Sequence, residues 1–319
     1  MSLDRIQGVL YGQAIGDSLG YLTEFLTPAT INKKWSDPTW PSGHPKHPPT
    51  HDWEPGDWTD DTDQAVEILV AYLDSRAQGL VDISQEELAY NLHHWMVTNG
   101  RGIGITTQRV MSTPGYIQSP EKIAHQDWLS SGSTTAPNGA VMRTSYVSII
   151  HPNDVEWVER NAVSCAKVTH ADPRCLASVV AVSNCIAYLI QGYSIADAMS
   201  QAAKDASKYD SEVVEWMYGT WDFIDPSNQP HMGYTYRCAG SAFWALRQVE
   251  SGASFLDAIR PLIRAGADAD TNAAVAGALV GAAIGASQIP RDLIDGLVHK
   301  GTLDQLLSDV TTPNYLVVE

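Results

Sequence analysis

Apolar residues recur at three- and four-residue intervals along most of this 319-residue chain, and few segments alternate as a half-buried strand does. One stripe consists of Ala65, Val66, Leu69, Tyr72 and Leu73, and another of Leu88, Leu92, Trp95 and Met96. The same spacing occurs over 157–170, 175–191, 195–208, 210–222, 238–250 and 254–265. The pattern predicts an all-α protein with about a dozen helices.

Three stretches lack this periodicity. Residues 33–58 are rich in Pro, Trp and His, residues 112–137 in Ser, Thr, Gly and Pro, and residues 223–237 also read as a linker. None is followed by a change in composition that would mark a second domain. We therefore expect one domain over 1–319, with long functional loops at about 33–58 and 112–137.

Glycine adds a second pattern, because it recurs at every fourth position in two places. Residues at this spacing share one helix face, and a glycine face lets two helix backbones approach closely. We expect these two helices to pack tightly and to hold the residues at their ends rigidly. The two sets are Gly8, Gly12, Gly16 and Gly20, and Gly277, Gly281 and Gly285.

Two acidic clusters stand where helices are expected to begin: Thr59, Asp60 and Asp61, and Asp268, Asp270 and Thr271. The first cluster alone is explained by Thr59 as an N-cap and by aspartates that complement the helix dipole. If the two helix starts meet, four carboxylates share a small buried volume, and two divalent cations would balance their charge. An all-oxygen ligand set suits Mg²⁺ or Mn²⁺.

Composition narrows the class of protein. The 37 acidic and 20 basic residues give a formal net charge of −17, which disfavours a nucleic-acid groove or an anionic membrane surface. The longest apolar run, 272–286, is shorter than the roughly 20 residues that span a bilayer, and the N-terminus has no signal-peptide pattern. Four cysteines without C-x-x-C spacing indicate buried free thiols. We expect a soluble, cytoplasmic protein.

The two acidic clusters, read as "WTDDTDQA" and "GADADTNAAVAGALVGAAIG", together resemble the paired signature of the ADP-ribosylglycohydrolase family. That family includes the ADP-ribosyl-acceptor hydrolases and the dinitrogenase reductase-activating glycohydrolase. Further segments are similar to its motifs in the family's order and extend the resemblance over nearly the whole chain. They are "GVLYGQAIGDSLGYLTE" (8–24), "PNGAVMR" (137–143), "THADP" (169–173) and "MGYTYRCAGSAFWAL" (232–246).

The resemblance implies an all-α orthogonal helical bundle with a binuclear Mg²⁺ or Mn²⁺ site. Its ligands would be Thr59, Asp60, Asp61, Asp268, Asp270 and Thr271, with Asp270 as the bridge. ADP-ribose would lie along the loop from Gly132 to Arg143, with His170 and the segment 232–234 near the adenosine or the distal ribose. The ligand-binding residues implied are Gly102, Gly132, Ser133, Thr135, Asn138, Gly139, Met142, Arg143, His170, Met232, Gly233 and Tyr234.

The implied reaction is hydrolysis of the bond between C1″ of ADP-ribose and an acceptor, through an oxocarbenium-like transition state. Glu24 would match the family's catalytic or gating glutamate and would act in catalysis with Asp60 and Asp270. For Asp17 we prefer a supporting role that orients a ligand or a water over direct metal binding. Arg143 and Arg101 are available to contact a diphosphate, and a structural salt bridge is an equal interpretation of Arg143.

Other residues remain open to two interpretations. His44, His47 and His51 have a spacing that zinc could use, but the prolines between them favour a solvated loop. The same loop, with Trp35, Trp40, Trp53 and Trp58, could instead form a lid.

Two regions depart from the family pattern. The stretch "NGRGIGITT" (99–107) places Gly102 where the arginine-specific branch has an aspartate, and "STTAPNG" (133–139) replaces the adenosine loop of the serine-type hydrolases. The alternative functions are a noncatalytic ADP-ribose-binding or crystallin-like protein and a metal-dependent phosphohydrolase. The expected partner is ADP-ribose or an ADP-ribosylated acceptor, and a monomer is favoured.

Overall fold

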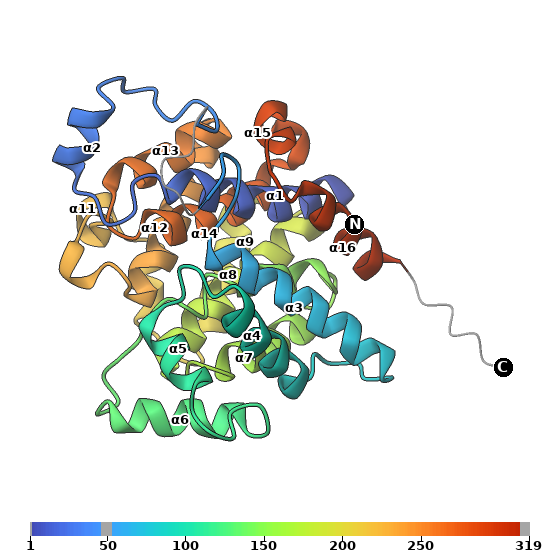
Figure 1. Cartoon of the computed structure of the whole chain (residues 1–319). Helices are drawn as coiled ribbons and strands as arrows, with labels where there is room; N and C mark the ends of the chain where they lie inside the picture. The colour runs from blue at the N-terminus through green and yellow to red at the C-terminus, as the bar shows by residue number, and fades with distance from the viewer. Residues whose placement is uncertain (1, 46–52, 313–319) are drawn as a thin grey trace.

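The computed structural model describes residues 2–45 and 53–312. These residues contain α-helices and short 3₁₀ helices and no β-strand, so the all-α prediction is confirmed (Figure 1). The N-terminal helices are α1 (Leu3–Gly20), α2 (Pro28–Lys34), α3 (Asp60–Ala77), α4 (Gln85–Thr98), α5 (Ile105–Met111) and α6 (Pro120–Ser130). The central ones are η1 (Thr144–Ile149), α7 (Val155–Lys167), α8 (Pro173–Gln191), α9 (Ile195–Ala206), α10 (Val213–Met217) and α11 (Trp221–Ile224). The C-terminal ones are η2 (Gln229–His231), α12 (Thr235–Glu250), α13 (Phe255–Ala265), α14 (Ala269–Ile284), η3 (Ala286–Gln288), α15 (Arg291–Asp295) and α16 (Lys300–Thr311).

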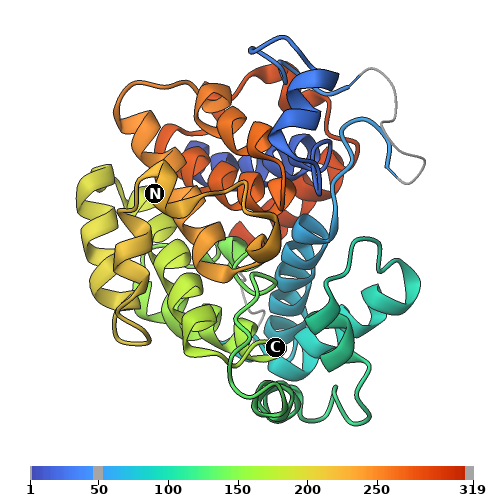
Figure 2. The same cartoon turned by 90° about the vertical axis from the view of Figure 1, so that its left-hand side faces the viewer.

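Helices α1 and α14 lie side by side in the middle of the molecule and run in opposite directions (Figures 1 and 2). Their glycines meet in reciprocal pairs. A Cβ placed on Gly12 would lie 2.2 Å from the carbonyl oxygen of Gly277, and a Cβ on Gly277 would lie 2.0 Å from that of Gly12. Near the other end of the contact, a Cβ on Gly20 would lie 2.4 Å from the carbonyl oxygen of Ala269. The predicted tight packing is confirmed, and it brings the end of α1 to the start of α14.

Eight of the sixteen α-helices in the described residues begin at a residue whose side chain caps the first turn. The side-chain oxygens of Ser2, Ser84, Asp154, Ser194 and Ser254 each accept a hydrogen bond from a backbone N–H in the first turn. Such caps satisfy N–H groups that have no partner within the helix. Thr59, at the start of α3, makes no such bond.

The structure differs from the sequence-based expectation in two segments. The range 210–222 is not one helix, because α10 ends at Met217 and Thr220 caps the separate short helix α11. The stretch 112–137 is not a continuous loop, because α6 occupies Pro120–Ser130, with proline at its first position. Its turn-forming composition misled the prediction, since proline is well tolerated in the first helical turn.

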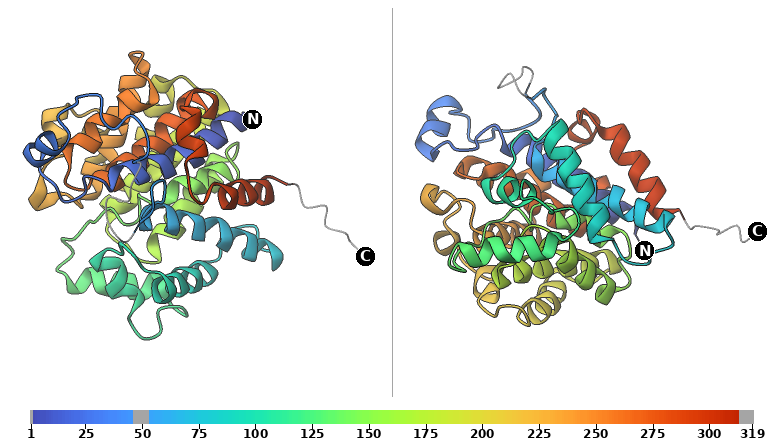
Figure 3. Two further views of the ribbon diagram at one scale, coloured as in Figure 1. Left: turned by 45° about the horizontal axis from the view of Figure 1, so that its top comes forward. Right: turned by 60° about the horizontal axis from the view of Figure 1, so that its bottom comes forward.

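Helices α4, α5 and α6 gather on one side of α3, away from the α1–α14 pair (Figure 3). Helix α8 is long and apolar enough to cross a bilayer by composition, but 83% of its apolar window is buried inside the fold. It packs against α7, α9, α12 and α14 as a core helix. The four cysteines are buried free thiols, as expected.

Candidate active site

The two acidic clusters meet at one cavity of 370 Å³. Asp60 and Asp61 open α3, Asp268 immediately precedes α14, and Asp270 lies in its first turn. Glu24 reaches the same cavity from the turn that follows α1. A larger hollow of 690 Å³ lies between α1, η3, α15 and α16, but the acidic clusters do not line it. The expectation that the two helix starts meet is therefore confirmed.

Asp17, on the last turns of α1, is fully buried and organises the start of α3. Its Oδ1 accepts hydrogen bonds from the backbone N–H of Thr59 at 3.1 Å and from the Thr59 hydroxyl at 2.8 Å. Its Oδ2 accepts the backbone N–H of Thr62 at 3.0 Å and the Thr62 hydroxyl at 2.6 Å. Asp17 does not line the cavity. It lies behind the acidic residues and fixes the backbone that carries them.

Thr59 stands at the N-cap position of α3 but does not act as a cap. Its hydroxyl donates toward Asp17 and toward Asp61 Oδ2, at 2.8 and 3.2 Å, instead of accepting a backbone N–H of α3. The capping interpretation of Thr59 is therefore wrong. The hydroxyl proton points at carboxylates, which leaves the oxygen lone pairs directed elsewhere.

Neutral groups orient the carboxylates. Asp60 Oδ2 accepts a hydrogen bond from Gln64 Nε2 at 3.1 Å, and Asp268 Oδ2 accepts one from Asn138 Nδ2 at 2.6 Å. Asp61 Oδ1 is buried and has no hydrogen-bond partner. Within 2–45 and 53–312, no lysine, arginine or histidine forms an ion pair with these carboxylates. The described residues thus leave the negative charge of the cluster largely uncompensated.

Burial raises the pKa of every carboxyl group in the cluster, and mutual repulsion adds to the rise for Glu24, Asp60, Asp61 and Asp270. Burial, with the charges of Asp268 and Asp17, raises the pKa of Glu24 to about 8. For Asp268 and Asp61, hydrogen bonding from Thr271 partly offsets the rise. Thr271 therefore interacts with carboxylates from both helix starts.

The chemistry of this donor set fits divalent cations that prefer oxygen. One carboxylate oxygen from each of Glu24, Asp268 and Asp270 lies within 4.8 Å of the other two. The unpartnered Oδ1 of Asp61 and the lone pairs of the Thr59 hydroxyl add two further oxygens. Hard oxygen ligands of this kind suit Mg²⁺ and Mn²⁺. The residues present could therefore hold such ions, and a buried cluster of carboxylates without cations would be destabilised by repulsion.

Many of the predicted ligand-binding residues line this cavity with the carboxylates. They are Gly102, Asn138, Gly139, Met142, His170, Met232 and Gly233. Sequence reasoning missed the others, which are Phe25, Ile103, Gly104, Ile105, Thr106, Thr107 and Pro137. The side chains of Phe25 and Ile105 are exposed at its mouth. Nothing in the local pattern identified these apolar residues, although 103–107 directly follow Gly102.

Gly102 adopts a backbone conformation that favours glycine and lies close to Asp60. Its φ is +83°, and a Cβ at this position would lie 2.7 Å from Asp60 Oδ1. Any side chain at 102 would therefore press on this carboxylate. In this backbone an aspartate at 102 would need a strained positive φ and a shift of the Asp60 carboxylate, which is a local physical reason for the departure from the arginine-specific pattern.

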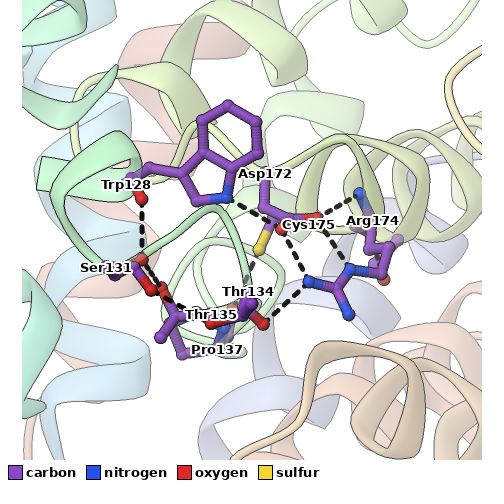
Figure 4. Close-up of polar contacts among 9 residues, drawn as sticks. Trp128, Ser131, Thr134, Thr135, Pro137, Asp172, Arg174 and Cys175 are labelled. Carbon is purple, nitrogen blue, oxygen red and sulfur yellow. Dashed lines mark hydrogen bonds and ion pairs between the residues drawn. The ribbon is translucent and has the colours of Figure 1, made fainter. Parts of the chain in front are cut away.

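The loop residues Gly132, Ser133 and Thr135 do not line the cavity. Figure 4 shows how their loop is held. Asp172 accepts a hydrogen bond from Trp128 Nε1 at 2.9 Å and forms an ion pair with Arg174 at 2.7 Å, and Arg174 Nη2 donates to the carbonyl of Thr134 at 2.9 Å. Ser131 and Thr135 share a hydroxyl hydrogen bond of 2.9 Å. The loop leads into the cavity wall at Pro137 and Asn138.

Tyr234 and Arg143 also lie outside the cavity lining. Tyr234 forms an isolated β-bridge with Pro137, and its ring packs against Trp216 with ring centroids 5.5 Å apart. Arg143 is completely buried, and its hydrogen bonds go to neutral acceptors. Both earlier interpretations of Arg143, a diphosphate contact and a salt bridge, are therefore wrong. Arg101, the other proposed diphosphate contact, forms an ion pair with Asp57 at 3.3 Å.

The histidine and tryptophan loop gives a mixed result. His44 is half-buried, with ring nitrogens 3.2 Å from Ser18 Oγ and 2.9 Å from the carbonyl oxygen of Leu293, so the solvated interpretation is wrong for it. His47 and His51 lie outside the described residues. The described tryptophans do not line the cavity. Trp35 stacks on Trp40, Trp53 packs near Tyr21, and Trp58 is buried and donates to Asp63.

Known proteins are similar to this chain over nearly its whole length. The family model described as ADP-ribosylglycohydrolase matches residues 1–316. The chain is 27% identical to ADP-ribosylarginine hydrolase Tri1 of Serratia proteamaculans, covering 96% of this chain and 78% of that protein. It is 25% identical to the ADP-ribosyl-[dinitrogen reductase] glycohydrolase of Rhodospirillum rubrum, covering 93% and 91%. A solved structure of an ADP-ribosylglycohydrolase-related protein complex shares the fold, with a TM-score of 0.70, 23% identity and 96% coverage of both chains.

Proposed function

We propose, from the premise that this chain belongs to the ADP-ribosylglycohydrolase family, that it releases ADP-ribose from an ADP-ribosylated acceptor by hydrolysing the bond at C1″. The observation that carries the proposal is the meeting of two acidic helix starts and Glu24 at one cavity. Ligand cavities commonly hold about 300–1,000 Å³, and the 370 Å³ here falls within that range.

Thr59, Asp60, Asp61, Asp268, Asp270 and Thr271 are the proposed ligands of two Mg²⁺ or Mn²⁺ ions. When bound, such ions supply orientation of the ribose hydroxyls and of a water, and they offset negative charge. The uncompensated carboxylates and the unpartnered Asp61 Oδ1 support this assignment. Asp17 supports the site from behind by holding Thr59 and Thr62.

Glu24 is the proposed proton carrier. Its pKa of about 8 means that its carboxyl group holds a proton at neutral pH when the neighbouring carboxylates are uncompensated. A group of this kind transfers a proton to a leaving acceptor or takes one from a water, a contribution worth about 10²–10⁴-fold in rate. Burial and the charges of Asp268 and Asp17 favour this proton-holding state, whereas the hydrogen bond with Asp270 opposes it.

The neutral wall of the cavity is the proposed site of the ADP-ribosyl group. Asn138 orients Asp268 and lies beside Gly139 and His170. Ile103, Met142 and Met232 add apolar residues to this lining, and Phe25 and Ile105 are exposed at its mouth. Because the chain carries a net charge of −17, the affinity for a diphosphate must come from the cations and from these local donors.

The proposal does not depend on one particular acceptor. The relatives include proteins named for arginine and for dinitrogen reductase substrates, at 25–27% identity. The glycine at 102 departs from the arginine-specific pattern, as described above. The acceptor class is therefore left for direct measurement. Buried free thiols support action in the cytoplasm.

The test is release of free ADP-ribose from arginine-, serine-, nucleotide- and phosphate-linked ADP-ribosyl substrates, with Mg²⁺, with Mn²⁺ and with chelator. Metal-dependent release from one of them supports the proposal and identifies the acceptor class. Binding of ADP-ribose without release from any of them contradicts it and favours the noncatalytic binding protein.

A second experiment isolates Glu24. The variant Glu24→Gln keeps the shape of the side chain and removes its proton transfer, so turnover should fall about 10²–10⁴-fold while ADP-ribose affinity changes little. The matched control is Glu250→Gln, which alters an exposed glutamate at the end of α12. Equal turnover in the two variants would remove Glu24 from the mechanism.

A further inference from the structure

Arg143 is a completely buried arginine that forms no ion pair with a carboxylate in the described part of the chain. Its Nη1 donates to Gln64 Oε1 at 3.0 Å and to the carbonyl of Gly139 at 3.1 Å. Its Nη2 donates to the carbonyl of Cys165 at 3.1 Å and to the Thr169 hydroxyl oxygen at 2.6 Å. A planar guanidinium with four such bonds has a fixed orientation. It can therefore fix the orientation of the groups that it contacts.

One branch of this network reaches Asp60. Gln64 is completely buried, and its Oε1 accepts the hydrogen bond from Arg143. The amide nitrogen must then point the other way, and it donates to Asp60 Oδ2 at 3.1 Å. Arg143 thereby sets the orientation of an amide that in turn orients one of the proposed metal ligands.

The other branch reaches His170, and its hydrogen bonds determine which ring nitrogen of His170 carries the proton. The guanidinium can only donate, so the Thr169 oxygen accepts from Arg143. The Thr169 hydroxyl has one proton, and His170 Nδ1 lies 2.7 Å from its oxygen. If Nδ1 were protonated, Thr169 would accept twice and its own proton would lack this partner. Among the described residues the Thr169 hydroxyl has no other hydrogen-bond partner, so its proton is satisfied when Nδ1 accepts, which places the imidazole proton on Nε2.

His170 lines the cavity with Gly139, and its Nε2 is buried without a hydrogen-bond partner among the described residues. Burial and then the positive charge of Arg143 lower the pKa of His170 to about 3, so the ring is neutral at physiological pH. A Cβ on Gly139 would lie 2.9 Å from His170 Cε1, so glycine is needed for the backbone to pack on this ring. A neutral ring has one N–H, and its position decides whether Nε2 donates or accepts.

We propose that Arg143 is a positioning residue that, through Thr169, holds His170 as the Nε2–H tautomer, so that this ring offers a hydrogen-bond donor to an oxygen of the bound ADP-ribosyl group. The same guanidinium, through Gln64, holds Asp60 in its orientation. The role of the ligand rests on the proposed function, whereas the tautomer follows from the protein alone. The network links the metal-binding side of the cavity to its neutral wall.

The test uses two buried threonines, of which Thr169 links Arg143 to His170 and Thr144 does not. Thr169→Val removes the hydroxyl that links Arg143 to His170 and keeps the side-chain shape. The control Thr144→Val makes the same change next to Arg143 at an equally buried hydroxyl, which has no hydrogen-bond partner. Thr169→Ser restores a hydroxyl and should restore the behaviour of the native protein.

The first readout is the tautomer of His170, taken from the ¹⁵N chemical shifts of its two ring nitrogens without substrate. The native protein, Thr144→Val and Thr169→Ser should show a protonated Nε2, and Thr169→Val should lose this preference. A protonated Nδ1 in the native protein would overturn the proposal without any variant. So would an unchanged tautomer in Thr169→Val.

The second readout is the dissociation constant of ADP-ribose by calorimetry. Thr169→Val should weaken binding about tenfold or more relative to Thr144→Val, because a lost or misdirected donor leaves a ligand oxygen unpaired. Equal affinity in the two variants overturns the ligand role. If no protein form binds or releases ADP-ribose while Thr169→Val still changes the tautomer, the proposed function fails and the positioning by Arg143 stands.

The Gln64 branch is tested with Mn²⁺ alone. Gln64→Leu removes both amide bonds, and Mn²⁺ affinity should fall about 10–100-fold, as is typical when a group that orients a metal ligand is removed. Unchanged Mn²⁺ affinity would contradict this branch. Thr144→Val again serves as the control and should bind Mn²⁺ as the native protein does.

Discussion

The carboxylate of Asp17 on α1 accepts both the backbone N–H and the hydroxyl of Thr62 on α3, at 3.0 and 2.6 Å. These residues are 45 positions apart in the sequence. The second oxygen of Asp17 binds Thr59 in the same way. The first turn of α3, which carries Asp60 and Asp61, is thus fastened to the helix that packs on α14.

The variant Asp17→Asn should destabilise the protein by about 2–3 kcal/mol, because its amide nitrogen would face donors and leave buried N–H groups unpaired. It should also weaken Mn²⁺ binding, since the start of α3 would shift. Urea unfolding in chelator measures the first effect, and calorimetry with Mn²⁺ the second. The control is Asp222→Asn at an exposed position. A loss of stability no larger than in the control would contradict the role of Asp17.

The variant Asp270→Asn should have opposite effects with and without metal. Burial and the charges of Glu24, Asp61, Asp268 and Asp17 raise the pKa of Asp270, so the ionised carboxylate destabilises the metal-free fold. Its removal should raise the melting temperature in chelator. It should abolish the metal-induced stabilisation, which is worth about 2.7 kcal/mol when the metal concentration is about 100-fold above its Kd.

Thermal unfolding in chelator and in excess Mn²⁺ checks both effects of Asp270→Asn. Asp295→Asn, which alters an exposed carboxylate paired with Arg291, is the control and should respond to Mn²⁺ like the native protein. A normal Mn²⁺ response in Asp270→Asn would refute its assignment as a ligand.

The variant Gly12→Ala tests the contact between α1 and α14. A Cβ at this position would lie 2.2 Å from the carbonyl oxygen of Gly277, so the helices must separate. We expect a loss of about 3 kcal/mol or more in the free energy of unfolding, as for a severely overpacked core.

The matched control for this contact is Gly301→Ala in α16, where a Cβ meets nothing within 4 Å. Alanine should stabilise that helix by about 0.5–1 kcal/mol, because glycine loses more conformational entropy in a helix. Denaturant unfolding of both variants provides the comparison. Native-like stability in Gly12→Ala would show that the close approach is not needed.

Glu67 on α3 should make stability depend on pH. Burial, with the charges of Asp63 and Asp74, raises its pKa from an ordinary value of 4.5 to about 7 in the folded protein. The folded state then binds the proton more tightly than the unfolded state, so this group makes stability fall as pH rises from about 4.5 to about 7.

Replacement by an uncharged side chain in Glu67→Gln should therefore stabilise the protein above about pH 7, by about 1 kcal/mol after allowance for partial exposure. Near pH 5 the difference should be small. Melting temperatures across this range provide the measurement. Glu86→Gln, at an exposed position on α4, is the control. A constant difference between Glu67→Gln and the native protein at all pH values would contradict the prediction.

The helices and much of the site could be predicted from local patterns. The spacing of apolar residues predicted an all-α chain, and the glycine repeats predicted the α1–α14 contact, because both depend on which residues share a helix face. The paired Thr and Asp clusters pointed to one oxygen-rich site, and the structure brings them together at one cavity.

Helix boundaries were predicted less well where a local helix start or cap disagrees with the composition or spacing of the longer segment. The stretch 112–137 has the composition of a loop, yet proline at the start of α6 is compatible with the first helical turn. The range 210–222 has a helical spacing, yet Gly219 and the cap at Thr220 divide it. The spacing of apolar residues indicates which residues share a helix face, but it does not indicate where the helix ends.

The sequence by itself determined which residues share a buried helix face and where the acidic helix starts lie, since both depend on residues within a few positions of each other. What only the tertiary structure decided is the partner of each polar side chain. The Thr59 hydroxyl donates to Asp17, 42 positions away, and Arg143 donates to Gln64, 79 positions away. Neither residue therefore has the role that the sequence around it suggested. The physical reason is that a buried donor must be satisfied by whichever acceptor the packed helices place beside it.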